Sequence, residues 1–430
     1  MELKKIKEIF NFEKGSLQST KCTPGKYDFI TASSDWKTHK TFDNDCEALV
    51  VAVAASGSLG RVHYVNGKFI SSDLCFILTP KDSKKFPIDL KFYYSIFKSI
   101  REDLVKKTAT GTAKQAINKT NFGNYEVPYY SIEQQKELAP KFERLAIKQE
   151  DLQSEVQFQE NTLPRLTELV IRDAVEGKLT MEWRRKNANI ESADQLLDEI
   201  RKEKEVLIKN KEIKKEKEIL KLTKKDEPYK IPDNWTWCRM QEVGLFQRGK
   251  SKHRPRNDTR LFENGTIPFV QTGDVARSKA NGYRIESCST YYNDYGLSQS
   301  KLWPKNTMCI TIAANIAQTG FLDMEACFPD SVVAFIPLTD PSIARYVRYF
   351  IDLTKTEIEK YAPATAQKNI NLGIISELKI PLPPEKEIKK IVEILDSFQE
   401  KTRFLEEVTT TTKEEVSLLS RSFLKEAFVD

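Results

Sequence analysis

The chain is poor in the residues that build metal centres and disulfide frameworks. Its 430 residues include only three histidines, and no cysteine stands near them in ligand spacing, which argues against a zinc site. The seven cysteines, an odd number without a CxxC pair, favour a reducing cytoplasm over a set of disulfides. No run approaches eighteen apolar residues, so no membrane-spanning helix is expected. The amphipathic start Met1–Lys7 lacks the apolar core of a signal peptide.

Signatures of catalysis are also missing. There is no glycine-rich cofactor loop, no Asn-Pro-Pro-Tyr or Asp-Pro-Pro-Tyr of an adenine methyltransferase, and no nuclease cluster of the Pro-Asp…Glu-x-Lys type. Gly244–Ser251 does fit the P-loop expression GxxxxGK[ST]. A P-loop must follow a buried strand and open into a helix that holds phosphate, whereas the Lys-His-Arg-Pro that follows Ser251 does not start a helix. An ATPase built on this segment is therefore the weaker alternative.

The chain contains an internal repeat, which has to be recognised before the fold is assigned. Thr112–Asn118 reads Thr-Ala-Lys-Gln-Ala-Ile-Asn and Thr365–Asn371 reads Thr-Ala-Gln-Lys-Asn-Ile-Asn, at a difference of 365 − 112 = 253. The same difference relates Val127-Pro128 to Ile380-Pro381 and keeps the apolar positions in phase for some sixty residues. The two halves are copies of one unit.

Upstream of these segments the repeat is looser. Glu8–Gly15 resembles Glu242–Gly249 at a difference of 249 − 15 = 234. The apolar run that ends at Gly60 is matched with the one that ends at Gly320. Because the register slips between these anchors, we expect loops of different length and content in the two copies.

Each copy ends in a predicted long helix. From Ser131 to about Val175 the apolar residues step by three and four, as in the seam of a coiled coil. Pro164 is expected to kink or break this helix and Gly177 to end it. If helical throughout, each rod is ~65 Å long. The predicted packing positions are Leu138, Phe142, Leu145, Leu152, Leu166 and Val170 in the first helix, and Ile391, Leu395, Phe398, Leu405, Leu419 and Phe423 in the second.

The remaining segments predict two α+β domains. Short β-branched runs at 49–53, 69–70, 74–78, 308–312 and 332–336 indicate strands, and helices are expected at about 88–106 and 341–360. A charged stretch from Ile190 to about Lys225, capped by Ser192 and Gln195, predicts an exposed connecting helix. The expected segments are domain 1 (1–127), the central helix (128–180), a charged linker (181–229), domain 2 (230–380) and the distal helix (381–430).

The charge distribution indicates nucleic-acid contact more clearly than the formal total of +6 does. Six cations crowd residues 248–260 against a single acid, Asp258. Such a block can be a plain solvated loop or a phosphate-binding surface, and the two interpretations are about equally supported. The candidate DNA-binding residues are Lys14, Lys114, Gln115, Arg248, Lys250, Lys252, Arg254, Arg256, Arg260, Gln367 and Lys368. The repeated Asn118 and Asn371 are assigned to architecture.

Two variable domains, each followed by a proline-led helix, resemble a known family. The segments that carry the resemblance are Ile380–Pro384, Ile231–Trp235, Thr365–Ile370 and the helix end Ala174–Leu179. In combination they are typical of the specificity subunit of type I restriction–modification enzymes. Val127–Tyr130 lacks the proline pair that the family usually has.

This resemblance implies a fold and a role. Two target-recognition domains would be joined by two long helices packed as an antiparallel coiled coil, with a pseudo-twofold relation between the repeats. Each domain would read half of a split double-stranded DNA target, and the helices would set the gap. The partners implied are two methyltransferase subunits and motor–nuclease (restriction) subunits, and S-adenosylmethionine, ATP and magnesium would belong to those partners rather than to this chain. A coiled-coil adaptor without DNA binding is the other alternative, and it leaves two divergent domain surfaces unexplained.

Overall fold

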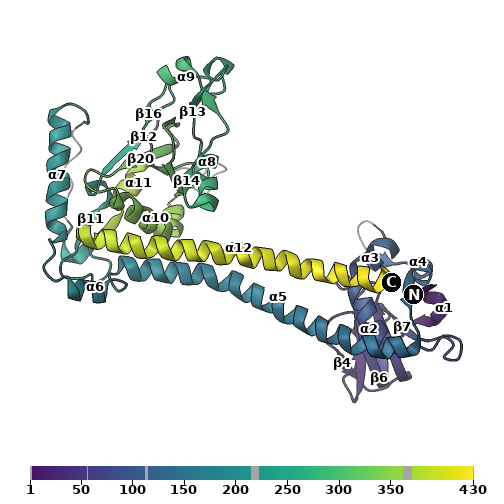
Figure 1. Cartoon of the computed structure of the whole chain (residues 1–430). Coiled ribbons are helices and arrows are strands. Elements are labelled where there is room, and N and C mark those ends of the chain that lie inside the picture. The colour runs from purple at the N-terminus through teal and green to yellow at the C-terminus, as the bar shows by residue number, and fades with distance from the viewer. Residues whose placement is uncertain (1, 56, 112–114, 215–221, 362–369, 430) are drawn as a thin grey trace. The chain divides into compact units, whose positions relative to one another are not determined.

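The protein folds as two compact units. A computed structural model describes residues 2–55, 57–111, 115–214, 222–361 and 370–429. One unit comprises Met1–Glu160 with Glu407–Asp430, and the other comprises Asn161–Glu406. Each holds one domain of mixed helix and sheet, together with parts of two long helices, α5 (Ile132–Val175) and α12 (Glu385–Val429), which are labelled in Figure 1. The predicted α+β class is confirmed.

The first domain contains a six-stranded sheet in the order β2-β7-β5-β6-β3-β4. Its strands are β2 (Phe10–Lys14), β3 (Tyr27–Ile30), β4 (Lys37–His39), β5 (Asn44–Ala52), β6 (Val62–Ser71) and β7 (Cys75–Pro80). Neighbouring strands are antiparallel except for β3 and β6, which are parallel. The strands predicted at 49–53, 69–70 and 74–78 correspond to β5, β6 and β7.

Both faces of the central strand β5 are covered. Successive side chains of a strand point to opposite faces, and Leu49 and Val51 join the core under helices α2 (Leu90–Ser99) and α3 (Arg101–Thr108). Val50 lies in a separate core on the other face. This two-sided burial explains why the strand appears in the sequence as a continuous apolar run.

The second domain repeats this topology. Its sheet has the order β12-β20-β17-β18-β14, and only β14 and β18 are parallel. The strands are β12 (Leu245–Arg248), β14 (Arg284–Ile285), β17 (Met308–Thr311), β18 (Thr319–Leu322) and β20 (Val332–Ile336). Order and direction match β2-β7-β5-β6-β3 strand for strand, so the predicted duplication is confirmed in the fold.

The register of 253 extends into the helices that follow the sheets. In α2 the hydroxyl of Tyr93 donates to the carbonyl of Pro128 at 3.0 Å. In α10 (Ser342–Lys360) the hydroxyl of Tyr346 donates to the carbonyl of Pro381 at 2.6 Å. Both pairs differ by 253 (346 − 93 and 381 − 128). Each helix is therefore tied to the start of its long helix by the same contact.

The predicted equivalence of Gly60 with Gly320 is wrong. Gly60 adopts φ +72° and its amide donates to the carbonyl of Ala52 at 2.8 Å. The same turn in the second domain is made by Ala317, at φ +56°, whose amide donates to the carbonyl of Thr311 at 2.8 Å. The match of Gly60 with Gly320 followed from the apolar runs that precede them. A left-handed conformation costs a non-glycine residue roughly 1–2 kcal/mol, and Ala317 nevertheless adopts it, so no glycine marks this turn in the second copy. Gly320 instead lies inside β18.

A two-stranded ribbon closes each domain. The entering strand β1 (Glu2–Lys5) pairs with the leaving strand β10 (Glu126–Tyr129), and β11 (Thr236–Arg239) pairs with β21 (Lys379–Leu382). Each entering strand is followed by a capping glutamate at the register of 234: Glu8 accepts from the amide of Lys5 at 3.1 Å, and Glu242 from that of Arg239 at 2.8 Å. The ends of each domain are thereby held together where the long helix begins.

The long helix α5 runs without a break through Pro164, so the break considered for this proline is absent. A proline forfeits one intrahelical hydrogen bond, and the flanking turns keep theirs. The helix ends at Val175, two residues before Gly177, which takes φ +75°. The predicted stop is confirmed.

Within the second unit, the end of α5 packs against the start of α12. Ile171 and Val175 share a buried core with Ile388 and Ile391. Just beyond α5, Thr180 donates to the buried carboxylate of Glu387 at 2.7 Å, so these two helix segments run antiparallel. The same carboxylate accepts from the indole of Trp235 at 2.9 Å, which ties the entrance of the second domain to α12.

The connecting helix is shorter and less exposed than predicted. It is α7 (Ala193–Lys209), and the Ser192–Gln195 capping box is present as expected. Ala193, Leu196, Leu197 and Ile200 are buried in the core of the second unit. These four apolar side chains therefore pack the helix into the second unit, which the charged sequence around them did not reveal.

Candidate nucleic-acid interface

Each domain begins its variable surface at a glycine that directly follows the first strand of the sheet. A Cβ at Gly15 would lie 2.2 Å from the carbonyl oxygen of Ser72, and one at Gly249 would lie 2.2 Å from that of Pro329. The chain passes so close to the neighbouring backbone that only glycine fits. Because this approach is the same in both copies, the segments that leave the two glycines occupy equivalent places.

The residue before each glycine is basic and exposed. Lys14 ends β2 and Arg248 ends β12. Both stand at the point where the sheet gives way to the loop that differs between the domains. Their equivalence supports treating them as counterparts in any contact with a repetitive polyanion such as a DNA backbone.

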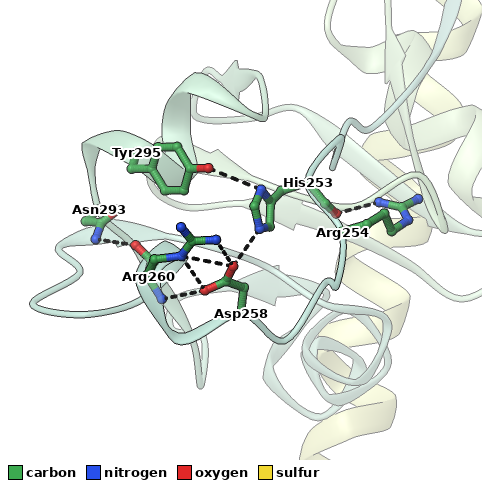
Figure 2. Close-up of polar contacts among 6 residues, drawn as sticks. All are labelled: His253, Arg254, Asp258, Arg260, Asn293 and Tyr295. Atoms are coloured by element: carbon green, nitrogen blue, oxygen red, sulfur yellow. Dashed lines mark hydrogen bonds and ion pairs between the residues drawn. The ribbon is translucent and has the colours of Figure 1, made fainter.

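A hydrogen-bonded cluster organises the basic segment of the second domain (Figure 2). The carboxylate of Asp258 accepts from the guanidinium of Arg260, with Nη2 at 2.7 Å, and from Nε2 of His253 at 2.7 Å. The Tyr295 hydroxyl lies 3.3 Å from the other ring nitrogen of His253. The bonds from Arg260 and His253 hold the pKa of the Asp258 carboxyl well below its usual range. Arg260 is therefore partly neutralised, although it is exposed.

Two further arginines of this segment are held in different ways. Arg256 forms two hydrogen bonds to the carboxylate of Asp330, at 2.8 and 2.9 Å. Arg254 donates to the backbone carbonyls of Ser251 and His253, at 2.8 Å each, so its side chain is fixed while its charge is not neutralised. Only the second kind of contact leaves the positive charge available to an anion.

Four cations of the segment remain without an acidic neighbour. Among the residues that the structure describes, no carboxylate lies within ion-pair distance of Arg248, Lys250, Lys252 or Arg254. Nearby, Lys301 lies over the ring of Trp303 at 3.9 Å. Burial, and then the charge of Lys250, lower the pKa of Lys301. A bound anion would relieve this crowding of positive charge.

The first domain carries a basic and aromatic surface that the sequence did not single out. Trp36 is 41% exposed, and its indole donates to Nδ1 of His63 at 3.1 Å. Burial lowers the pKa of His63, in keeping with a neutral ring that accepts this bond. Phe42 is exposed and lies under the ammonium of Lys68 at 4.9 Å. Four further lysines are exposed on β4 and on the segments before β3 and after β4: Lys21, Lys26, Lys37 and Lys40.

No sequence signal marked this surface, because its lysines are spread over two loops and a strand. They do not form a run like that at 248–260. The pairing of β3 with β4 brings the segments together. The exposed side chain of Trp36, directly before Lys37 at the start of β4, makes the surface recognisable.

The repeated polar segments lie partly within the described chain. Asn118 caps helix α4 (Lys119–Asn124) by accepting from two backbone amides, and Asn371 caps α11 (Leu372–Ser376) in the same way from one. This bears out the architectural assignment of both residues. Gln115 is exposed. Lys114, Gln367 and Lys368 lie outside the described residues.

The P-loop alternative fails on geometry. Within Gly244–Ser251, residues Leu245–Arg248 are themselves a strand, β12, paired with β20. No helix begins between Ser251 and Asp258, and the amide of Lys250 is bonded to the carbonyl of Phe328 at 3.0 Å. A phosphate cradle needs free amides at a helix start. The lysine and glycine of the pattern belong to the end of a sheet strand instead.

The predicted helix-packing positions fall into two groups. Ile391 and Leu395 are buried in the core of the second unit, and Val170 packs against that core. Leu138 and Phe142 pack against the first domain, where the Phe142 ring lies 5.7 Å from that of Phe92. Leu138, Phe142, Ile391 and Leu395 thus join each long helix to its own domain, whereas Val170, near the end of α5, packs against the core of the second unit.

Other seam positions remain open to solvent. Exposed fractions are 37% for Leu145, 41% for Leu152, 43% for Leu166 and 46% for Leu405, while Phe398 is half-buried. The side chains of Leu419 and Phe423 lie outside the described residues. Within the first unit the two long helices meet through polar groups, with the hydroxyl of Thr409 donating to Gln159 at 3.0 Å and Lys413 pairing with Glu160 at 2.6 Å. The first unit thus combines these polar pairs with buried apolar side chains on both long helices, Val156 and Val416.

In the described part of the chain, no three metal-ligating side chains gather in a way that could hold a metal ion. No described helix is long and apolar enough to cross a membrane.

Comparison with known proteins decides the family. The sequence model described as "Type I restriction modification DNA specificity domain" matches residues 1–156 and 232–414, once over each domain and helix. The chain belongs to this family. It is therefore a DNA-specificity subunit, and it acts by recognising DNA rather than by catalysis.

Individual relatives agree with this assignment. The chain is 23% identical to the EcoDI specificity subunit of Escherichia coli over 98% of this chain and 86% of that protein. It is 25% identical to the EcoR124I/EcoR124II specificity subunit of the same species, over 40% of this chain and 42% of that protein, so the matched stretch spans less than half of that relative.

Solved structures share the fold of the specificity subunit. The HsdS subunit from Thermoanaerobacter tengcongensis is 17% identical, with a TM-score of 0.51 over 99% of this chain and 96% of that one. A chain from a study of complex assembly and conformational transition of the type I R-M system is 17% identical, with a TM-score of 0.53 over 99% of this chain and 97% of that one.

Proposed function

We propose that the two domains of this specificity subunit each read one half of a bipartite, asymmetric DNA target. The observation that carries this proposal is the pair of domains with the same strand order and direction but different surfaces. Equivalent frames would present two readers to the two strands of a duplex, whose backbones are related by twofold symmetry. Different loops on those frames would read different bases.

In the second domain, the DNA contacts would come from the segment that follows β12. The four cations without an acidic neighbour, Arg248, Lys250, Lys252 and Arg254, would bind phosphates. Arg256 and Arg260, which are paired with acids, would position the loop and contact phosphate less strongly. Lys114, Gln115, Gln367 and Lys368 would contact the backbone near the junction of each domain with its helix.

In the first domain, Lys14 would play the part of Arg248. The lysines around Trp36 and Phe42 would supply the remaining phosphate contacts, with an exposed aromatic ring available for apolar contact with a base edge.

The long helices would carry the partner subunits. Leu152 and Leu405 occupy equivalent places in the two copies (405 − 152 = 253), and both are exposed leucines on a helix. Repeated exposed apolar positions suit two copies of one partner, here two methyltransferase subunits. Restriction subunits would join the full complex, and S-adenosylmethionine, ATP and magnesium would be bound by those partners. The functional segments that we propose are domain 1 (1–127), the central helix (128–180), the charged linker (181–229), domain 2 (230–380) and the distal helix (381–430).

Reconstitution tests this function. The purified chain alone, and then with its methyltransferase subunits, is incubated with genomic DNA, and methylated sites are mapped by sequencing. We expect methylation only with the partners, at one target made of two specified parts separated by a gap of fixed length. Methylation by the chain alone, or a target with one continuous specified part, would contradict the proposal.

A further inference from the structure

The second domain is held to α12 by a group of polar side chains for which the first domain has no counterpart. The group, termed here the α10–α12 polar cluster, consists of Arg345, Arg348, Tyr349 and Asp352 from α10 and of Asp396 and Gln399 from α12. All of its members belong to the second unit.

Arg348 forms the centre of the cluster. It is only 3% exposed. Its guanidinium binds Oδ2 of Asp352 at 3.0 Å and donates to Oε1 of Gln399 at 2.8 Å. A buried charge is tolerated only when it is paired and hydrogen-bonded. The second of these bonds crosses from α10 to α12.

Tyr349 and Arg345 also bond across the same helix contact, and the single hydroxyl hydrogen of Tyr349 is shared between two acceptors. The hydroxyl of Tyr349 lies 2.7 Å from Oδ1 of Asp396 and 3.0 Å from Oε1 of Gln399. Arg345 donates to Oδ2 of Asp396 at 2.6 Å. Gln399 and Asp396, one turn apart on α12, thus receive every cross-helix bond of the cluster.

The cluster also reaches the variable layer of the domain. The guanidinium carbon of Arg348 lies 4.0 Å from the ring centre of Tyr283 and 3.7 Å from that of Tyr349, so the cation is placed between two aromatic faces. Tyr283 directly precedes β14, the last strand of the sheet order. A shift of α12 relative to α10 would therefore also displace Tyr283 and the start of β14.

Beside the cluster, a cavity of about 780 Å³ separates the sheet from α12. It is lined on the domain side by Arg284, Phe321 and Asp323 and on the α12 side by Asp396, Glu400 and Arg403. Over this area the sheet does not pack directly on the helix. Beside the cluster, α10 and α12 also share a buried apolar core that includes Val347, Val392 and Leu395. The polar cluster adds directional bonds to this apolar contact.

In the first domain, the corresponding contact between α2 and α5 is built from different residues. At the register of 253, the equivalents of Arg348, Tyr349, Asp352, Asp396 and Gln399 are Ser95, Ile96, Ser99, Glu143 and Ala146. No such cluster can form from these residues. The contact there includes the Phe92–Phe142 ring pair and an exposed ion pair between Lys98 and Glu150 at 3.0 Å.

We propose that the α10–α12 polar cluster is a positioning device that sets the angle of the second domain on α12, and thereby the gap between half-sites that the complex accepts. The inference rests on the proposed function, in which two domains read two half-sites. Apolar contacts are non-directional, and a purely apolar junction tolerates small rotations. Hydrogen bonds weaken steeply when bent, so a cluster of them selects one angle.

Two single substitutions test the proposal in the full chain with its methyltransferase subunits. Tyr349→Phe removes one hydroxyl and keeps the ring. Gln399→Leu removes the acceptor shared by Arg348 and Tyr349. Lys401→Ala, at an exposed position of α12 outside the cluster, is the control. Duplexes carry both half-sites, as mapped for the unchanged complex, with the native gap or with one base pair more or fewer. Dissociation constants and methylation rates are measured for each.

We expect the unchanged complex and Lys401→Ala to prefer the native gap strongly. Both cluster variants should lose about tenfold of that preference, which corresponds to about 1.4 kcal/mol, because the altered gaps become acceptable. An unchanged preference, with or without a uniform loss of affinity, would mean that the cluster only stabilises the domain, and would overturn the proposal. If Gln399→Leu does not fold, Tyr349→Phe decides. Failure of the unchanged complex to distinguish gaps would instead count against the proposed function itself.

Discussion

At the scale of single residues, the close approach of one backbone segment to another restricts which residue a position can hold more strictly than charge does. The two glycines that follow the first strands recur because the carbonyls of Ser72 and Pro329 leave no room for a Cβ. The loops beyond them share no such constraint, and they diverge. A residue fixed by geometry is thus followed directly by residues free to change with the DNA target.

The first prediction concerns Gly249. Gly249→Ala should destabilise the second unit by about 1–3 kcal/mol, as overpacking does, because its Cβ would overlap the backbone at Pro329. Gly273→Ala is the matched control, since its Cβ would meet only the end of the Arg277 side chain at 3.4 Å and alanine favours helix α8 (Thr272–Arg277). Urea unfolding of both variants measures the difference. Equal stability of the two would contradict the close approach.

The second prediction separates free from paired cations. The double variant Lys252→Ala with Arg254→Ala should weaken binding to all DNA sequences and lower the salt dependence of log K by about 1.8, that is ~0.9 for each phosphate that the variant no longer neutralises. Arg256→Ala with Arg260→Ala should lower it less, because Asp330 and Asp258 already neutralise these side chains in part.

Binding is measured with the methyltransferase complex on target and non-target duplexes over a range of salt concentrations. If the first pair changed the preference for the target while the salt slope stayed constant, these residues would be reading bases instead of binding phosphates.

At the scale of elements, each long helix makes two kinds of contact. It packs against its own domain, and it meets the other long helix partly through polar side chains. Near its start each long helix packs against its own domain, as with the partly buried Phe142 and the buried Leu395. In the first unit they meet through Gln159, Thr409, Glu160 and Lys413. A polar contact fixes which residues face each other more strictly than apolar packing does. The pair Gln159–Thr409 therefore marks facing positions of α5 and α12.

The third prediction uses those facing positions. Inserting seven residues, one heptad, after both Gln159 and Thr409 should lengthen the helix pair by ~10.5 Å without changing the seam. The accepted gap should grow by about three base pairs, at ~3.4 Å each, and both half-sites should stay the same.

Methylated sites are mapped by sequencing for the paired insertion and for an insertion in α5 alone. The single insertion puts the two helices out of register and should abolish methylation. A change in the recognised bases with the paired insertion would contradict the role of the helices as a spacer.

At the scale of the whole molecule, the duplication separates what is shared from what is specific. The strand order, the closing ribbons and the Tyr93 and Tyr346 contacts are held in common. The loops after Gly15 and Gly249 and the α10–α12 polar cluster are not. Shared parts would serve assembly, and unshared parts would serve the asymmetric target.

The fourth prediction is a domain exchange. Replacing residues 1–127 by the first domain of a relative with another target should change one half-site and leave the other half-site and the gap intact. The junction contact to preserve is the bond from the Tyr93 hydroxyl to Pro128. Methylome sequencing reads the outcome directly. A change in both half-sites would show that the domains do not read independently.

Much of this molecule follows from its sequence. The repeat at 253, the strands at 49–53 and 332–336, the helix stop at Gly177 and the caps at Asn118 and Asn371 are local or periodic features, and each has one physical reading. The family follows from their combination. These features depend on neighbours along the chain, so the sequence contains all that is needed to recognise them.

Only the tertiary structure decided the rest. Whether Arg256 and Arg260 are free or paired depends on acids that approach in space, one of them 74 positions further along the chain. The surface around Trp36 exists because strands bring scattered lysines together, and the α10–α12 polar cluster joins residues about 50 positions apart. Contacts of this kind produce no periodic pattern in the sequence, because two side chains can come into contact in space at many different separations along the chain.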